Sequence, residues 1–279
     1  MTLALGSLAL AVWAYLLLGR GGFWRARERD GAAPRSAPPS GWPAVTAVIP
    51  ARDEADVVGA AVASLLRQDY GGALDVVLVD DQSTDGTAEA ARLAARECGA
   101  EQRLAVIAGR DLPAGWTGKL WALHQGIEQA LARPGPPPFL LLTDADIAYA
   151  PDMVGELVAE SLAGGLVLNS RMARLSCGNL AERALIPAFV FFFQMLYPFA
   201  WANSPGNRIA AAAGGCMLLR RQALAAAGGI QSIRRELIDD CALARRLKTQ
   251  GPIRLALSER VRSLRPYAAI GENRRMVAR

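Results

Sequence analysis

Beyond residue 43 the chain alternates short apolar, β-branched runs with stretches whose apolar residues recur at helical spacing. The apolar runs predict strands in the 45–54 region (TAVIPARDE), at 75–81, at 104–109 and in FLLLTDAD (139–146). The intervening periodicity predicts helices at 57–66, 89–95 and 120–131. Strands that alternate with helices favour an α/β fold, a Rossmann-like, mainly parallel sheet flanked by helices on both faces.

The N-terminus follows a different pattern, because residues 2–19 carry no charge. A run of this length is about what a helix needs to cross the hydrocarbon core of a membrane. A cleaved signal peptide is the alternative, but the run has no basic start and no small-x-small cleavage site. We therefore expect residues 1–20 to form a single transmembrane anchor.

Basic residues follow the apolar run, and none precedes it. The positive-inside rule then places the chain after residue 20 on the cytoplasmic side of the inner membrane. The residues concerned are Arg20, Arg25, Arg27 and Arg29. Their simplest partners are anionic lipid headgroups. The net charge of +5 gives no reason to expect a nucleic-acid partner, because basic residues do not interleave with aromatic ones.

Residues 21–43 are rich in Pro, Gly and Arg and show no periodicity, which is typical of a linker. The remaining chain, residues 44–279, is expected to form one domain. Its composition limits the metals that it could bind. Its only histidine is His124, and its four cysteines lack ligand spacing, so a zinc site is not expected. A metal here should be a hard, oxygen-bound ion such as Mg²⁺ or Mn²⁺.

A second apolar run, residues 184–202, includes an aromatic block and is long enough to span a bilayer. A span here would place the later acidic residues on the opposite side from the earlier ones, and Pro187, Gln194 and Pro198 interrupt the run. We expect a helix lying in the membrane interface, with Tyr197 and Trp201 at headgroup level. A buried core helix is the alternative.

Acidic residues follow the predicted strands in three places: at Glu54, at Asp80-Asp81, and at Asp144 and Asp146. Ligands of open parallel sheets bind outside the carboxyl ends of the strands. Acidic turns and helix caps would account for each pair taken alone. Together on one edge, they favour a site for a nucleotide and a divalent cation.

The ordered motifs VIPARDE, VVLVDDQSTDGT, GKLWALHQGI, LLTDAD, GGCMLLRR and LIDDCALARRLKTQG resemble the family 2 glycosyltransferases of the GT-A fold. They span about residues 45–265. GWTGKLWALHQG and ELIDDCALARRL are most similar to the hopene-associated glycosyltransferases of hopanoid gene clusters, and more distantly to ceramide glucosyltransferases.

This resemblance implies a UDP-sugar donor. The residues that would bind its nucleotide are Pro50, Arg52, Glu54, Asp80 and Asp81. Lys119 would lie near the diphosphate, and Asp144 and Asp146 would form the DxD pair that contacts ribose and holds the metal.

On the acceptor side, the resemblance implies that Asp240 is the general base. Gly214, Gly215, Cys216 and Asp239 would accompany it. A placed carboxylate that removes the acceptor proton contributes roughly 10²–10⁴-fold in rate. One base without a covalent intermediate means single displacement and inversion. An acidic helix start is the structural alternative for Asp239-Asp240, and it is compatible with this role.

The sequence departs from the family pattern in several places. The family's Thr-Glu-Asp is Ile238-Asp239-Asp240 here, His124 replaces a usual Asn, and PARDE replaces a more common Asn-Glu ending. The Gln-x-x-Arg-Trp element is missing, and Arg274-Arg275 is the nearest basic substitute. Relatives usually continue into membrane helices, so we expect a truncated chain.

We therefore predict a membrane-anchored, inverting glycosyltransferase that moves a sugar from a UDP-sugar to a lipid hydroxyl, of hopanoid or ceramide type, with Mg²⁺ or Mn²⁺. A sugar nucleotidyltransferase would need a Gly-rich basic loop after the first strand, and PARDE is neither. The remaining alternative is a membrane-attached UDP-sugar-binding subunit that has lost catalysis.

Overall fold

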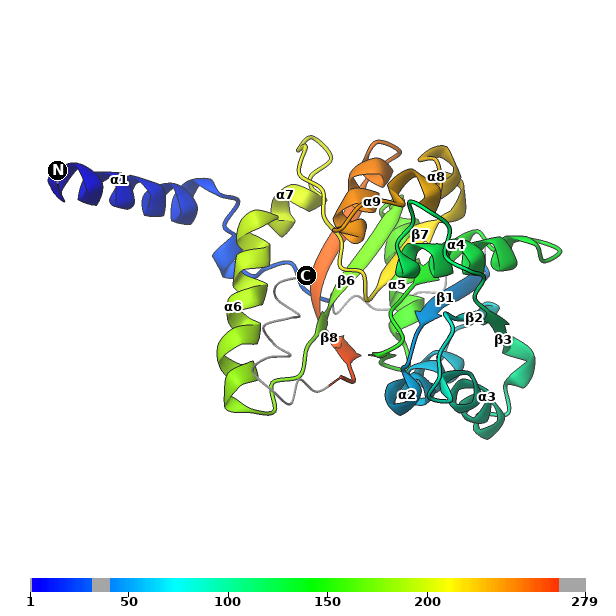
Figure 1. The fold of residues 1–279 in the computed structure, drawn as a ribbon. Helices are drawn as coiled ribbons and strands as arrows, with labels where there is room; N and C mark the ends of the chain where they lie inside the picture. Colours follow the sequence, from blue (N-terminus) through cyan, green and yellow to red (C-terminus); the bar gives the residue numbers. More distant parts are fainter. Residues whose placement is uncertain (1, 32–40, 266–279) are drawn as a thin grey trace.

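Four parallel strands from the first half of the chain form one side of the sheet (Figure 1). They are β1 (Val45–Ala51), β2 (Leu74–Asp80), β3 (Leu104–Ala108) and β4 (Phe139–Leu142), in the spatial order β3-β2-β1-β4. The computed structural model describes residues 2–31 and 41–265. Ala51 pairs with Asp80 and Val48 with Leu142, so the carboxyl ends of these strands meet at one edge, as predicted.

The second half of the chain completes an eight-stranded sheet within the described ranges. The order continues from β4 as β7 (Met217–Arg220), β6 (Leu168–Arg174), β8 (Ile253–Ser263) and β5 (Ile147–Tyr149). β7 is antiparallel to both of its neighbours, and β5 is antiparallel to β8. The sheet is therefore mixed, which the alternation in the first half of the sequence did not indicate.

The directions of these strands determine which segments reach the edge where the carboxyl ends of β1, β2, β3 and β4 meet, which we call the functional edge. Because β7 is antiparallel to both β4 and β6, β6 runs parallel to β4, and β8 runs parallel to β6. The carboxyl ends of β6 and β8 consequently lie at the same edge as that of β4. The long excursion between β6 and β7 starts and ends at this edge.

Helices cover both faces of the sheet, as the alternation predicted. α2 (Ala55–Leu66), α3 (Thr87–Glu97) and α5 (Met153–Ala163) pack on one face. α4 (Gly118–Leu131), α8 (Arg221–Ala226) and α9 (Asp239–Lys248) pack on the other. Alternate residues of β1 serve the two cores: Ile49 joins the first cluster and Val48 the second. Short helical turns occupy Glu101–Arg103 and Ile230–Ile233.

α4 lies unusually close to the sheet because of Gly126. A Cβ at this position would lie 2.4 Å from Cγ1 of Val48 and 2.9 Å from Cγ2 of Val79. Such distances are well inside van der Waals contact, so only glycine fits without a shift of the helix. The contact fixes α4 against the sheet and places the start of α4 over the carboxyl ends of the strands.

The N-terminal helix α1 (Thr2–Ala14) continues into a π-helical turn, Tyr15–Gly19, and projects from the body of the protein (Figure 1). The stretch Thr2–Gly19 is long and apolar enough to cross a membrane, and none of it is buried. These properties are those expected of an anchor, although length and composition alone also fit a signal sequence.

The second apolar run forms two helices, α6 (Leu180–Leu196) and α7 (Phe199–Asn203). Pro198 separates them, whereas Pro187 lies inside α6. Large apolar side chains of α6 are exposed, including Leu185 (37%), Phe192 (56%) and Leu196 (57%). α6 is thus a surface helix on the described part of the protein, unlike the alternative of a buried core helix.

Part of the segment predicted as a linker is packed on the domain. It begins with a 3₁₀ turn, Phe23–Arg25, in which Phe23 is buried. Arg29 then pairs in parallel with Leu257 of β8. Asp30 accepts a 2.8 Å hydrogen bond from Nε of the fully buried Arg171. Residues 32–40 of the predicted linker lie outside the described residues.

Candidate active site

The acidic clusters predicted at the strand ends do lie near one another at a single edge. Burial raises the pKa of Glu54, and the charges of Asp146 and Asp144 add to this rise, while Arg265 lowers the pKa. Glu54 comes from the loop after β1, and both aspartates follow β4. The two aspartates affect the pKa of Glu54 because the parallel pairing of β1 with β4 brings the ends of these strands together.

The loops after β1 and β2 hold each other through side chains. The Thr84 amide donates to Oδ1 of Asp53 at 2.9 Å, and the Asp53 amide donates to Oγ of Ser83 at 3.0 Å. Asp80 accepts a 3.0 Å hydrogen bond from the Ser83 amide, so it stabilises the turn. Asp80 therefore has the turn-stabilising role that was the structural alternative for the Asp80-Asp81 pair. The loop between β1 and α2 is fixed in place before any ligand binds.

Asp81 is the carboxylate of this pair that is left for a ligand. Its nearest cation is Arg52, with Nη1 at 3.8 Å from Oδ2. Backbone approaches it closely on the other side: a Cβ on Gly118 would lie 3.2 Å from Oδ2 of Asp81. Pro50, in β1, lies directly opposite Val79 of β2. The arrangement suits a carboxylate that accepts hydrogen bonds from a flat ligand between two loops.

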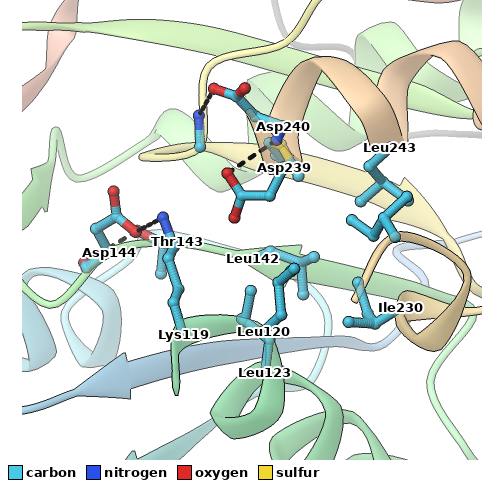
Figure 2. Close-up of a pocket in the computed structure, with 13 residues that line it drawn as sticks. Lys119, Leu120, Leu123, Leu142, Thr143, Asp144, Ile230, Asp239, Asp240 and Leu243 are labelled. Carbon is cyan, nitrogen blue, oxygen red and sulfur yellow. Dashed lines mark hydrogen bonds and ion pairs between the residues drawn. The ribbon is translucent and has the colours of Figure 1, made fainter. Parts of the chain in front are cut away.

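The Asp144 and Asp146 carboxylates point to different partners. Asp144 Oδ1 lies 2.6 Å from Nζ of Lys119 (Figure 2). Asp146 Oδ2 accepts a 2.9 Å hydrogen bond from Oγ of Ser263, at the end of β8. Between the strand and this pair, the buried Thr143 donates through Oγ1 to the Gly215 carbonyl at 2.8 Å. The turn is thereby tied to the loop that precedes β7.

Lys119 is the cation at the centre of the site, as Figure 2 shows. It stands at the start of α4, whose N-cap is Thr117. Burial alone would lower the pKa of Lys119, but the carboxylates of Asp144, Asp239 and Asp240 outweigh burial and raise the pKa. Lys119 therefore stays protonated and links the Asp144 turn to the start of α9.

Asp240, the predicted base, is held by two backbone amides. Its Oδ2 accepts from the Gly214 amide at 3.1 Å, and its Oδ1 accepts from the Cys241 amide at 2.6 Å. Burial raises the pKa of Asp240, and the like charge of Asp239 raises it further. The oriented carboxylate has the raised basicity that suits a group taking a proton from a hydroxyl.

The residues of the predicted acceptor-side loop lie in different surroundings, some in the site and some in the core. Gly214 lies in the site, where its amide binds Asp240. Gly215 contributes its carbonyl to the hydrogen bonds from Thr143 and from the Tyr149 hydroxyl. Cys216 is fully buried in the sheet core, where burial raises the pKa of its thiol to about 11. Cys216 thus supports the loop from the core and does not line the surface of the site.

Two residues at and just after the end of β8 belong to the site, although no sequence motif selects them. Arg265 forms an ion pair with Glu54, and its Nε lies 3.7 Å from Oδ2 of Asp146. Ser263 donates to the same Asp146 oxygen. Only the topology, in which β8 ends at the functional edge, places them here. Arg274 and Arg275, selected as substitutes for a missing basic element, lie outside the described residues.

Lys119, Asp144, Gly214, Asp239 and Asp240 form the polar mouth of one small pocket. Its inner wall is apolar and includes core side chains such as Leu120, Leu142 and Leu243 (Figure 2). The polar groups thus lie against an apolar floor, which weakens solvent screening of their charges.

Within residues 2–31 and 41–265 no group of three or more His, Cys, Asp or Glu side chains is placed to hold a metal ion. Asp144 and Asp146 nevertheless offer two carboxylates, with one residue between them, in the turn after β4. This donor set fits Mg²⁺ or Mn²⁺, since Mg²⁺ takes one or two protein carboxylates and completes its shell with substrate phosphates and water. The residues present are therefore compatible with a metal that arrives with a diphosphate.

The mixed sheet, with acidic turns at its carboxyl edge and a placed aspartate opposite, defines a GT-A type nucleotide-binding fold. The sequence model described as glycosyl transferase family 2 matches residues 46–228, and the chain belongs to that family. It is accordingly a glycosyltransferase. The matched region runs from β1 to the end of α8, so Asp239 and Asp240 lie beyond it.

Solved structures give the same fold. The mannosyltransferase PcManGT from Pyrobaculum calidifontis, in complex with GDP-Man and Mn²⁺, is 22% identical, with a TM-score of 0.62 over 95% of this chain and 70% of that chain. TarS from S. aureus is 17% identical, with a TM-score of 0.55 over 84% and 39% of the respective chains. TarS 1-349 in complex with UDP-GlcNAc is 16% identical, with a TM-score of 0.52 over 84% and 65%. No curated protein sequence matches significantly.

Proposed function

We propose that this glycosyltransferase moves a sugar from a UDP-sugar to the hydroxyl of a membrane lipid, with inversion. One observation carries the proposal. Lys119 lies between the Asp144 turn and the Asp239-Asp240 pair in one pocket, which supports a role for Lys119 as the cation near the diphosphate and for Asp240 as the base. A donor bound at the strand ends would direct its anomeric carbon toward Asp240.

The donor would bind through the loops after β1 and β2. Asp81 would accept from the nucleoside, next to Arg52, while Asp80 holds the turn. Lys119 would neutralise diphosphate charge. The choice of UDP rests on the resemblance to the hopene-associated glycosyltransferases. Among similar structures, TarS 1-349 is in complex with UDP-GlcNAc and PcManGT with GDP-Man.

Asp144 and Asp146 would hold Mg²⁺ or Mn²⁺ together with the donor phosphates. When bound, the divalent ion stabilises negative charge on the departing diphosphate. The protein's own part is to orient the two carboxylates: Ser263 fixes Asp146, and Lys119 pairs with Asp144. Arg265 lies near enough to add positive charge at the same edge.

Asp240 would take the proton of the acceptor hydroxyl as its oxygen attacks the anomeric carbon. The amides of Gly214 and Cys241 hold the carboxylate in position throughout. The carbon–oxygen bond to the diphosphate breaks as the new glycosidic bond forms, and the leaving nucleotide takes the bonding electrons. Attack from the face opposite the leaving group inverts the anomeric configuration.

A lipid acceptor is supported by the position of α6. In Figure 1 this helix runs across the direction of α1, so it would lie flat on a membrane that α1 crosses. Nε of Arg20, at the end of the apolar stretch, donates to the Met195 carbonyl at 2.7 Å. The C-cap of α6, Tyr197, packs against the cluster that contains Cys241, the neighbour of Asp240. A short path thus joins the membrane face to the base.

The test uses the full chain in detergent with bacterial lipid extract. UDP release is measured from a panel of UDP-sugars with Mg²⁺ or Mn²⁺ and an EDTA control, and hopanoid and ceramide acceptors are then added singly. We expect release from one donor that depends on both metal and lipid. Metal-dependent UDP binding without release under any condition would favour the non-catalytic binding subunit. A chain that does not bind UDP would contradict the proposal.

A further inference from the structure

The structure contains a second pocket, which shares no lining residue with the active site. Its volume is about 430 Å³, within the range of small-molecule sites. It lies where the end of the apolar N-terminal stretch meets α6 and α7. If α1 crosses the membrane, the pocket is at the level of the lipid headgroups.

One half of the pocket wall is apolar and the other half is polar. Leu17, Leu18 and Phe23 come from the N-terminal segment, and Phe199 comes from α7. The polar half includes Arg25 and Arg27 from the juxtamembrane turn. Glu28 also lines the pocket, but its carboxylate accepts a 3.0 Å hydrogen bond from Asn203. A ligand with both a charged and an apolar part would match these walls.

The four arginines after the apolar stretch differ in whether their side chains are hydrogen-bonded to backbone carbonyls. Arg20 bonds to carbonyls at the end of α6, and Arg29 donates to the Ala26 carbonyl at 2.9 Å. Arg25 lies over the Trp24 ring, and neither it nor Arg27 has a carboxylate partner within the described ranges 2–31 and 41–265. Arg25 and Arg27, whose side chains donate to no carbonyl in those ranges either, are the two that line the pocket.

Gln194 adds an uncharged polar group to the pocket. Its side chain lines the pocket from α6, is only 7% exposed, and makes no side-chain hydrogen bond within the described part of the chain. Gln125 is equally buried, but it accepts from the Arg110 amide and donates to the Trp121 carbonyl. The buried side-chain atoms without a partner in the described residues belong to Glu156 and Arg254, so the amide of Gln194 reaches the open space of the pocket and can bond to a ligand there.

We propose that this pocket binds the phosphate headgroup of one membrane phospholipid. Arginine is the preferred partner of phosphate oxygens, because its guanidinium offers several donors in one plane. Arg25 and Arg27 would hold the phosphate, Gln194 would bond to a phosphate or glycerol oxygen, and the first methylenes would lie against Leu18 and Phe199. The inference rests on the membrane attachment in the proposed function, but not on the identity of donor or acceptor.

The test measures lipid that stays bound to the full chain in detergent, using native mass spectrometry with added phosphatidylglycerol. The variants are Arg25→Gln/Arg27→Gln and Gln194→Leu. Arg29→Gln is the matched control, since it removes the same charge close by but outside the pocket. We expect one bound lipid per wild-type chain. The double arginine variant should weaken binding by roughly 10-fold or more, Gln194→Leu should weaken it as well, and Arg29→Gln should leave it unchanged.

Equal losses in the Arg29 control and the double variant would show diffuse attraction and overturn the proposal. Retention of lipid by both pocket variants would also overturn it. Displacement of the lipid by inorganic phosphate alone would identify a free-phosphate site instead. Gln194→Leu should melt no lower than wild type without lipid, because it removes an unpartnered amide. UDP release from the same preparations tests the catalytic proposal separately, so the two failures are distinguishable.

Discussion

The two halves of the sheet are built on different principles. Residues 45–142 form parallel strands with helices between them, and their core consists of apolar side chains on both faces. Residues 147–263 form mixed pairings around a fully buried arginine, Arg171, which bonds to Asp30, Glu160 and Asn169. The first half is specified by local pattern, whereas the second depends on contacts between distant segments.

This difference gives the two halves different tasks in our account. The regular half presents rigid loops to a nucleotide, and the irregular half brings membrane-facing segments to the base. Asp30, which lies just after the proposed anchor, reaches into the second half through Arg171. In this account the proposed anchor is therefore coupled to the proposed acceptor side through Asp30 and Arg171.

The largest effect is expected for the buried ion pair. Arg171→Met leaves Asp30 and Glu160 without their partner and should lower the free energy of unfolding by about 3–5 kcal/mol. Denaturant unfolding of the full chain in detergent measures this change. Arg174→Met is the control, because Arg174 and Glu259 form an exposed pair for which we expect about 0–1 kcal/mol. Similar losses in both variants would show that the second half does not depend on this network.

A comparable effect on catalysis is expected for the DxD pair. Asp146→Asn should reduce transfer by about 10²–10³-fold, because a stabiliser of the leaving diphosphate is weakened. The same variant should weaken metal-dependent UDP binding, measured by calorimetry with Mn²⁺ and with EDTA. Asp152→Asn, on a carboxylate at the start of α5 that pairs with Arg260, serves as the control for charge loss. If UDP binding by Asp146→Asn depended on Mn²⁺ as in the wild type, Asp146 would not be a metal ligand.

A moderate effect is expected where the first half is packed most tightly. Gly126→Val should lower the free energy of unfolding by about 1–3 kcal/mol, because α4 must move away from Val48 and Val79. Movement of α4 would also displace Lys119, so UDP affinity should fall together with stability. Gly206→Val is the control for the added bulk, because a Cβ there meets nothing within 4 Å and the backbone is not in the left-handed region.

The smallest effect concerns the pH dependence of transfer. Asp240 must be deprotonated to act as a base, and burial with the Asp239 charge raises its pKa. Activity should therefore be lost, as pH falls, at a higher pH than an ordinary carboxyl would give. Asp239→Asn removes the like charge and should move this acid limb to lower pH. Glu236→Gln, on a neighbouring exposed residue, should leave the limb in place.

The sequence predicted the regular half well because each element there carries its own pattern. The runs before Asp81 and Asp144 are continuous and apolar, and parallel pairing follows from the alternation with helices. The irregular half contains shorter strands and bonds between distant residues. Nothing local to Arg265 or Ser263 indicates that β8 ends beside Asp146. Cys216 shows the converse, since its motif position suggested the site but, directly before β7, it lies in the core.

The central claim is that Asp240 removes the acceptor proton in the same pocket where Lys119 meets the donor. It is tested most directly by single-turnover transfer and UDP affinity in Asp240→Asn, beside Asp56→Asn, which changes an exposed aspartate in the first turn of α2. We expect transfer by Asp240→Asn to fall by about 10²–10⁴-fold with UDP affinity unchanged, and Asp56→Asn to behave as wild type. Transfer at the wild-type rate in Asp240→Asn would contradict the account.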